Sequence, residues 1–118
     1  MIEDTAAAAQ RAAERIAAHV TRTPLRRSAT FSDALGADVF FKLENMQTTG
    51  SFKLRGATNR LLTLSDEQRD KGCVAASSGN HGAAVACAMQ KLGVSGIIFV
   101  PEQTSPAKVD KIRRDGGD

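Results

Sequence analysis

The sequence predicts an α/β protein with an open, mostly parallel sheet flanked by helices. Two short apolar segments, CVAA at residues 73–76 and GIIFVP at 96–101, have the length and composition of buried strands. A helical pattern follows each of them, and this order is typical of right-handed crossover units on a parallel sheet. The apolar segment DVFFKLE at 38–44 is the third strand we expect in this narrow sheet, which is incomplete within the 118 residues.

Two helices are predicted before that third segment. Small and apolar residues recur at helical spacing from residue 9 to residue 20, behind a cap at Asp4 or Thr5. Pro24 discourages any continuation of this helix. The segment SATFSDALGA then forms a short helix, and Gly36 marks its end.

Two more helices are predicted between residue 51 and the first of the two buried strands. The first begins at Ser51, whose hydroxyl is available to cap the opening turn, and Lys53 lies off its apolar stripe. That stripe consists of Leu54, Ala57, Leu61 and Leu64. Ser65 and Gln68 then have the spacing of a capping box for a short helix that ends at Gly72.

One helix is predicted after each buried strand. The alanine-rich AAVACAMQKLG ends at Gly93, and TSPAKVDKIRRDGG has Ser105 as its cap and Pro106 as its first residue. The inner face of the first comprises Val85, Ala88 and Leu92, and that of the second comprises Val109 and Ile112. Asp118 has the position expected for the entrance to another strand.

Composition and charge argue against several kinds of partner. With 42% apolar and 25% charged residues the sequence is that of an ordinary globular protein, and it has no apolar run that could cross a bilayer. The net charge of +3 could indicate nucleic-acid binding. However, charges of both signs intermix in KVDKIRRDGGD, and five Phe with no Trp or Tyr offer little for base stacking. We therefore expect neither a membrane nor a nucleic acid as partner.

The start of the chain and its two cysteines indicate a reducing compartment. MIEDTAAAAQRAAERIAAHV has acids before its alanines and arginines among them, unlike a secretory signal, so a cytoplasmic protein is expected. Cys73 and Cys87 lack the spacing of metal ligands. We expect both to be small, reduced and buried, and we expect no metal site.

The segment SSGNHG at residues 77–82 lies where open α/β sheets bind ligands, between the end of a strand and the start of a helix. Free backbone N–H groups and the helix dipole at such a point suit a carboxylate or a phosphate. The two glycines allow a ligand to approach the backbone. The same residue types also make an ordinary turn and helix cap, so the segment alone leaves both interpretations open.

Lys53, in TTGSFKLRGA, is the second candidate for chemistry. A solvated lysine is the ordinary interpretation. A lysine beside a dry, glycine-lined anion pocket would instead lose solvation, which favours the neutral amine that attacks a carbonyl. Gly56 leaves room on the same side of the helix for a flat ring, which Phe52 is placed to flank. Neither GxGxxG nor GxxxxGK[ST] occurs, so nucleotide binding has no support.

The segments TGSFKLRGA and SSGNHG, with TPL and LEN upstream, resemble the serine and threonine dehydratase family. This is the fold-type II group of pyridoxal phosphate enzymes, with the tryptophan synthase β-like fold, and the resemblance runs from about residue 21 to the end. It implies a pyridoxal 5'-phosphate-dependent ammonia-lyase that converts L-threonine or L-serine to a 2-oxo acid and ammonia. The same family includes serine racemase and hydroxyaspartate ammonia-lyases, which stay open as alternatives. A homo-oligomer is implied for the full-length protein.

The resemblance also implies a role for each site residue. Lys53 would form the Schiff base with the cofactor and later carry the proton at the substrate α-carbon. Phe52 would pack near the ring, and Asn80 would hydrogen-bond the ring hydroxyl oxygen. Ser78 matches the serine that serves the opposite face of the α-carbon in racemising relatives, although a serine there does not itself establish racemisation. The carboxylate-binding set would comprise Ser77, Ser78, Gly79, Asn80 and His81 with their backbone amides.

The resemblance finally implies an N-terminal fragment, inactive alone. The family's glycine-rich phosphate loop lies beyond residue 118. Residues 1–45 would belong to the larger cofactor domain, and residues 46–118 would form a truncated small α/β domain with Lys53 and SSGNHG. A different class of function stays open, namely a non-catalytic binding or assembly module that uses the unfinished sheet edge and uncovered apolar faces.

Overall fold

The computed structural model describes residues 4–116, and it confirms the alternating strands and helices of an α/β fold. Asp118, expected at the entrance to another strand, lies outside the described residues. The elements are α1 (Thr5–Ile16), β1 (Leu25–Arg27), α2 (Ala29–Leu35), β2 (Phe40–Lys42), the 3-10 turn η1 (Glu44–Met46), α3 (Lys53–Leu62), α4 (Asp66–Asp70), β3 (Cys73–Ala76), α5 (Asn80–Leu92), β4 (Gly96–Phe99) and α6 (Pro106–Arg114).

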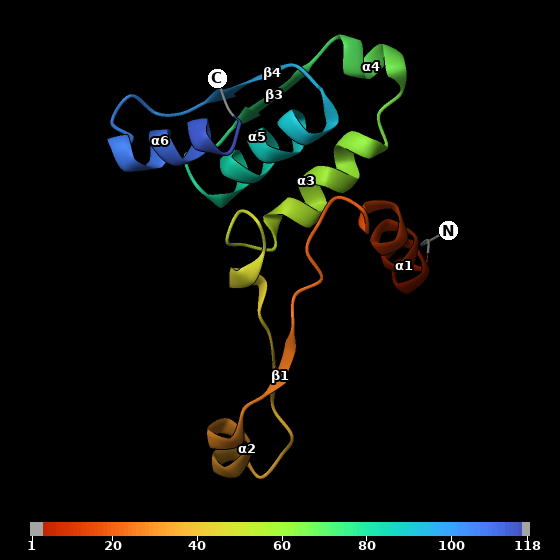
Figure 1. Cartoon of the computed structure of the whole chain (residues 1–118), viewed down its shortest axis with the longest axis vertical. Helices are drawn as coiled ribbons and strands as arrows, with labels where there is room; N and C mark the ends of the chain where they lie inside the picture. Colours follow the sequence, from red (N-terminus) through yellow and green to blue (C-terminus); the bar gives the residue numbers. More distant parts are fainter. Residues whose placement is uncertain (1–3, 117–118) are drawn as a thin grey trace.

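The parallel sheet consists of β3 and β4, which α5 connects (Figure 1). Side chains alternate between its two faces, so that Ala75 and Ile98 join the core against α5. Val74, Ile97 and Phe99 point to the other face and are exposed. The described elements therefore cover this sheet on one side, although a parallel sheet requires cover on both.

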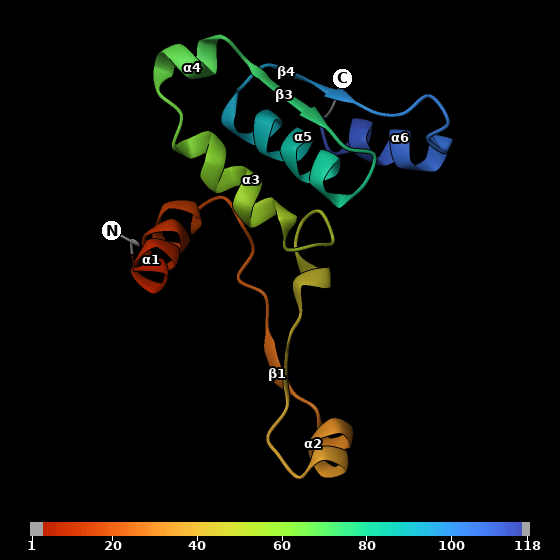
Figure 2. The same ribbon diagram turned by 180° about the vertical axis from the view of Figure 1, so that it is seen from behind.

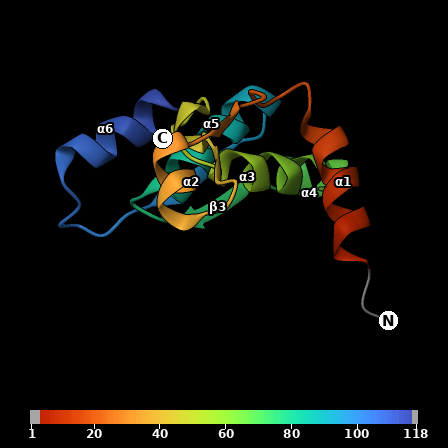
Figure 3. The same cartoon turned by 90° about the horizontal axis from the view of Figure 1, so that it is seen from below.

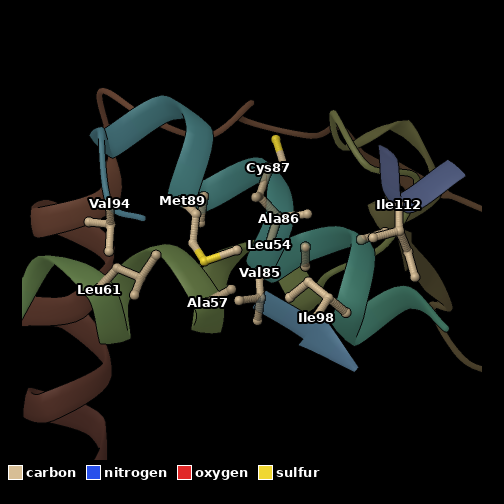
Figure 4. Packing of buried hydrophobic residues seen from close by; sticks show 13 residues of the cluster. Leu54, Ala57, Leu61, Val85, Ala86, Cys87, Met89, Val94, Ile98 and Ile112 are labelled. Atoms are coloured by element: carbon tan, nitrogen blue, oxygen red, sulfur yellow. The ribbon is translucent and has the colours of Figure 1, made fainter. Parts of the chain in front are cut away.

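The core lies between α3 and α5, and Figure 4 shows how closely the two helices approach. Leu54, Ala57 and Leu61 form the buried stripe of α3, as predicted. The prediction of a single buried face on α5 was too narrow, because every residue from 82 to 89 is buried. Small side chains allow α3, the sheet and α6 to pack around this one helix.

The third predicted strand lies in a different sheet from the one expected. β2 pairs with β1 in an antiparallel register, Leu25 opposite Lys42 and Arg27 opposite Phe40. The two strands and α2 form an arm that projects from the rest of the chain (Figures 1 and 2). The prediction that 38–44 joins the parallel sheet is wrong. Only the short helix α2 separates β1 from β2 in the chain, so β1 offers β2 a nearer pairing edge than β3 or β4.

The arm makes the chain extended. Its radius of gyration is 16.8 Å, whereas a compact chain of this length has roughly 13.5 Å. Its accessible surface is 8025 Å², against about 6200 Å² for a compact monomer of its mass. Figure 3 shows α1 and α6 at opposite ends of the molecule. The described residues therefore do not close into one globule.

Most helix ends follow local sequence signals, but α1 ends at Ile16 rather than at residue 20, and Ser105 precedes α6 without the predicted side-chain hydrogen bond. Asp4 and Ser28 cap α1 and α2, and the capping box of α4 is formed as predicted. Gly36 and Gly93 adopt left-handed conformations at their predicted helix ends. The predicted Ser51 cap is wrong, because α3 begins two residues later and the Ser51 hydroxyl is buried without a hydrogen-bond partner.

Candidate functional site

Two hollows border the segments that the sequence singled out. The larger, about 690 Å³, lies beside α3 and β3. Its walls include Phe52, Lys53 and Gly56 from the start of α3, together with Ala75, His81 and Val85. A smaller hollow of about 520 Å³ lies at the ends of β3 and β4 and is bordered by Ser77, Ser78 and Gly79. The site residues therefore fall into two groups, and Asn80 borders neither hollow.

Lys53 is the first residue of α3, and its ammonium lies 5.1 Å from the centre of the Phe52 ring. The structure thus brings Lys53 and Phe52, at the start of α3, to the same hollow as His81 of α5. The expectation that Lys53 is stripped of water is wrong for this chain, because the residue is exposed. Within residues 4–116, the walls of this hollow come from α3, from the segment that spans α4 and β3, and from the first half of α5.

The segment at 77–82 is part turn and part helix. α5 begins at Asn80, so that residues 80–82 form its first turn, three residues earlier than the periodicity indicated. In any α-helix the amides of this turn have no carbonyl acceptor within the helix. Ser77 is held in place, because its N–H donates to the Phe99 carbonyl and its hydroxyl accepts from the Gly79 N–H. The loop therefore presents free amides at the positive end of a 13-residue helix.

The two glycines of this segment have different surroundings. A Cβ added at Gly79 would meet no atom within 4 Å, which leaves its backbone open to a ligand. A Cβ added at Gly82 would overlap the Ser77 carbonyl oxygen and press on Ile112. Only Gly79 therefore fits the predicted approach of a ligand, whereas Gly82 allows α5 to pack close to the end of β3.

A group of polar side chains that the sequence did not reveal lies beside the start of α3. Arg55 donates two hydrogen bonds to the Glu44 carboxylate, Nε to Oε2 at 2.8 Å and Nη2 to Oε1 at 2.7 Å. The Thr23 hydroxyl donates to the same carboxylate. Gln47 exchanges two hydrogen bonds with the Thr21 backbone, at 2.8 and 2.9 Å. We call Thr21, Thr23, Glu44, Gln47 and Arg55 the polar clasp.

The polar clasp holds Glu44 ionised. The hydrogen bonds from Arg55 lower the pKa of the Glu44 carboxyl to about 2, with smaller contributions from the Thr23 hydroxyl and the charges of Arg55 and Lys42. Partial burial opposes this shift. The hydrogen bond to Glu44 in turn raises the pKa of Arg55. LEN is part of the family resemblance, but no periodicity in the sequence pairs Glu44 with Arg55.

Neither cysteine forms a disulfide. Cys87 is buried, and burial raises the pKa of its thiol, while Cys73 is half-buried beside the larger hollow. Within residues 4–116 no three His, Cys, Asp or Glu side chains gather so as to hold a metal ion. In the same range, no helix combines the length and apolar character needed to cross a membrane.

The comparison with protein families identifies the fold. The model for pyridoxal-phosphate dependent enzymes matches residues 16–118. The chain belongs to this family. These residues fit the cofactor of the family, since Lys53 borders a hollow large enough for a flat ring. A Cβ added at Gly56 would meet no atom within 4 Å, so the helix leaves room beside the lysine. The alternation of strands and helices is accordingly that of the fold-type II enzymes.

Individual relatives include both lyases and racemases. The biosynthetic L-threonine dehydratase of Mycobacterium bovis is 49% identical over 108 residues, which are 92% of this chain and 25% of the dehydratase. Maize serine racemase superposes with a TM-score of 0.86 at 42% identity, over 92% of this chain and 33% of the racemase. Threonine deaminase isoform 2 from Solanum lycopersicum gives 0.83 at 38% identity, over 98% of this chain and 33% of the deaminase. The chain thus spans about a quarter to a third of these relatives.

Proposed function

We propose that this chain supplies the cofactor lysine and the carboxylate-binding loop of an ammonia-lyase that converts L-threonine or L-serine to a 2-oxo acid and ammonia. The observation that carries the proposal is that Lys53 and His81 border one hollow in a chain of the pyridoxal phosphate family. When bound, the cofactor supplies an electron sink that allows loss of the α-proton and expulsion of the β-hydroxyl.

The residues of this chain have separate tasks in the proposal. Lys53 would hold the cofactor through its amine and would serve as the general base at the substrate α-carbon. Phe52 would pack beside the ring, and Asn80, the first residue of α5, would hydrogen-bond the ring oxygen. Ser78 would serve the opposite face of the substrate α-carbon. The carboxylate accepts hydrogen bonds from the amides of the first turn of α5, where the helix dipole favours an anion.

Two features of this loop support the proposed carboxylate site. The first turn of α5 leaves its amides unpaired, and Gly79 leaves the backbone open beside them. Ser77 precedes this turn and His81 lies within it, and both belong to the proposed carboxylate site. The exposure of Lys53 is compatible with the proposal, because a ring bound in the hollow would itself exclude water from the amine.

Reductive labelling tests the proposal. We would add pyridoxal phosphate, reduce with borohydride and map the adducts by peptide mass, using Lys91 on the far end of α5 as the internal reference. We expect an adduct on Lys53 in preference to Lys91, and its loss in K53R with the Lys91 signal unchanged. Labelling spread evenly over the surface lysines would reject the cofactor role of Lys53.

In the full-length protein, consumption of D- or L-serine without 2-oxo acid release would redirect the assignment to a racemase. Preference for hydroxyaspartate would redirect it within the lyases.

A second candidate, of another class, is an assembly module. The exposed apolar face of β3 and β4, formed by Val74, Ile97 and Phe99, favours it. A chain that stays monomeric at high concentration and binds no apolar dye would count against this function.

The ammonia-lyase proposal also includes a cytoplasmic location and a homo-oligomeric full-length protein. It further includes a division at residue 45 between the larger cofactor domain and the small domain.

A further inference from the structure

We propose that the ion pair between Glu44 and Arg55 positions Lys53 by fixing the first turn of α3. The inference rests on the proposed role of Lys53 in binding the cofactor. Lys53 and Arg55 are two residues apart, so the pair acts close to the amine without touching it. Glu44 and Arg55 are therefore positioning residues rather than catalytic ones.

The first turn of α3 has no cap of the usual kind. Phe52 occupies the N-cap position and cannot accept a hydrogen bond through its side chain. The hydroxyls of Thr49 and Ser51, just before the helix, are buried without partners. A helix start without a capping side chain frays more easily. Some other contact must therefore hold this turn if Lys53 is to point in one direction.

The polar clasp provides that contact from two other segments. Arg55 and Glu44 form two parallel charge-assisted hydrogen bonds, which fix direction as well as distance. The Arg55 guanidinium also reaches the Thr21 carbonyl at 3.2 Å, and Thr23 donates to Glu44. Both charged side chains are largely shielded, with 31% of Arg55 and 17% of Glu44 exposed. Such a pair is stronger than a solvated surface ion pair.

Helix geometry links the polar clasp to the direction of Lys53. Successive residues are about 100° apart around an α-helix, so residues 53 to 56 point in four directions. Leu54 is fully buried in the core beside α5, and Arg55 is held by Glu44. With these two directions fixed, the first turn cannot rotate about the helix axis. Lys53 and Gly56 therefore face the larger hollow.

The alternative is that the pair merely joins the arm to α3 and stabilises the chain. Four variants separate the two roles: E44Q, R55Q, the double variant E44Q/R55Q, and R27Q as the matched control. R27Q removes the exposed ion pair between Arg27 and Asp38 on the arm, remote from α3. Far-UV circular dichroism establishes that each variant is folded. If R55Q does not fold, R55K replaces it, because lysine keeps the charge and loses the two parallel bonds.

The first measurement is amide hydrogen exchange along α3. We expect exchange at Gly56 and Ala57 to accelerate by about tenfold or more in E44Q and in R55Q, given the usual strength of hydrogen bonds to charged groups. Exchange at Leu61 and Leu62 should stay unchanged, and R27Q should behave as the unaltered chain. The double variant should match the single ones, since the two residues act as a unit. Acceleration spread evenly over α3, or none, overturns the proposal.

The second measurement is the share of reductive cofactor labelling on Lys53 relative to Lys91. We expect this share to fall by about tenfold in E44Q and R55Q, because small misplacements of a reacting group have effects of that size or larger. An unchanged share with a faster-exchanging first turn would overturn the positioning role. If the unaltered chain itself labels without preference for Lys53, the proposed function fails, while hydrogen exchange still decides whether the ion pair fixes the turn.

Discussion

Replacing Glu44 by glutamine should remove a pH-dependent part of the stability of this chain. The carboxyl has a pKa of about 2 in the folded chain, against 4.5 ordinarily, chiefly because Arg55 hydrogen-bonds its ionised form. Each pKa unit corresponds to about 1.36 kcal/mol, so the shift of 4.5 − 2 = 2.5 units corresponds to roughly 3 kcal/mol. Because the side chain is only 17% exposed, solvent screens this energy weakly.

The sign of the pH dependence follows from the lowered pKa. Above pH 4.5 the carboxyl is ionised in the folded and the unfolded chain, and the stabilisation is fully present. As the pH falls from 4.5 towards 2, the unfolded chain takes up the proton while the folded chain resists it. About 2 kcal/mol of the stabilisation should therefore be lost by pH 3. Arg55 stays charged throughout this range and adds no pH dependence of its own.

Urea unfolding of the unaltered chain and of E44Q between pH 7 and pH 3 checks this expectation. The difference in unfolding free energy should be largest at pH 7 and should shrink as the pH falls, because other carboxyls titrate equally in both chains. E67Q is the matched control, since the Glu67–Lys71 pair is 80% and 71% exposed and such pairs contribute little. A difference for E44Q that is as small as that for E67Q, or that is the same at pH 7 and pH 3, would refute the reasoning.

Four other substitutions test local packing and helix capping. G82A should destabilise the chain by about 1–3 kcal/mol in urea unfolding, because the new methyl overlaps the Ser77 carbonyl. G79A is the control and should fold normally, because the space around Gly79 is open. Equal stabilities of the two variants would contradict this contrast. S65A should cost about 1 kcal/mol by removing half of a capping box, measured by thermal unfolding, and an unchanged midpoint would show that α4 does not contribute. L54A should cost about 2–5 kcal/mol, since this side chain is fully buried, and a cost below 1 kcal/mol would place it outside the core.

Local signals account for what the sequence predicted well. The start of α1, the ends of α2 and α4, and the stripe of α3 each depend on a few residues that are close together in the sequence. The pairing of β2 could not be predicted in this way, because a three-residue strand fits either sheet and the choice depends on which edge lies nearest. The same limit applies to the exposure of Lys53, since solvation depends on side chains from other elements that face the amine.

The polar clasp shows most clearly why a site cannot be assembled from motifs alone. Glu44 and Arg55 flank the lysine in the sequence, but Thr21 and Thr23 come from a segment beyond the arm. A motif records which residues are present, while the direction of Lys53 depends on how these three segments meet. If the ion pair fixes that direction, Glu44 of LEN and Thr23 of TPL accompany the lysine because they orient it, and not only because they contact a ligand. The E44Q and R55Q experiments therefore bear on why these upstream residues accompany the lysine at all.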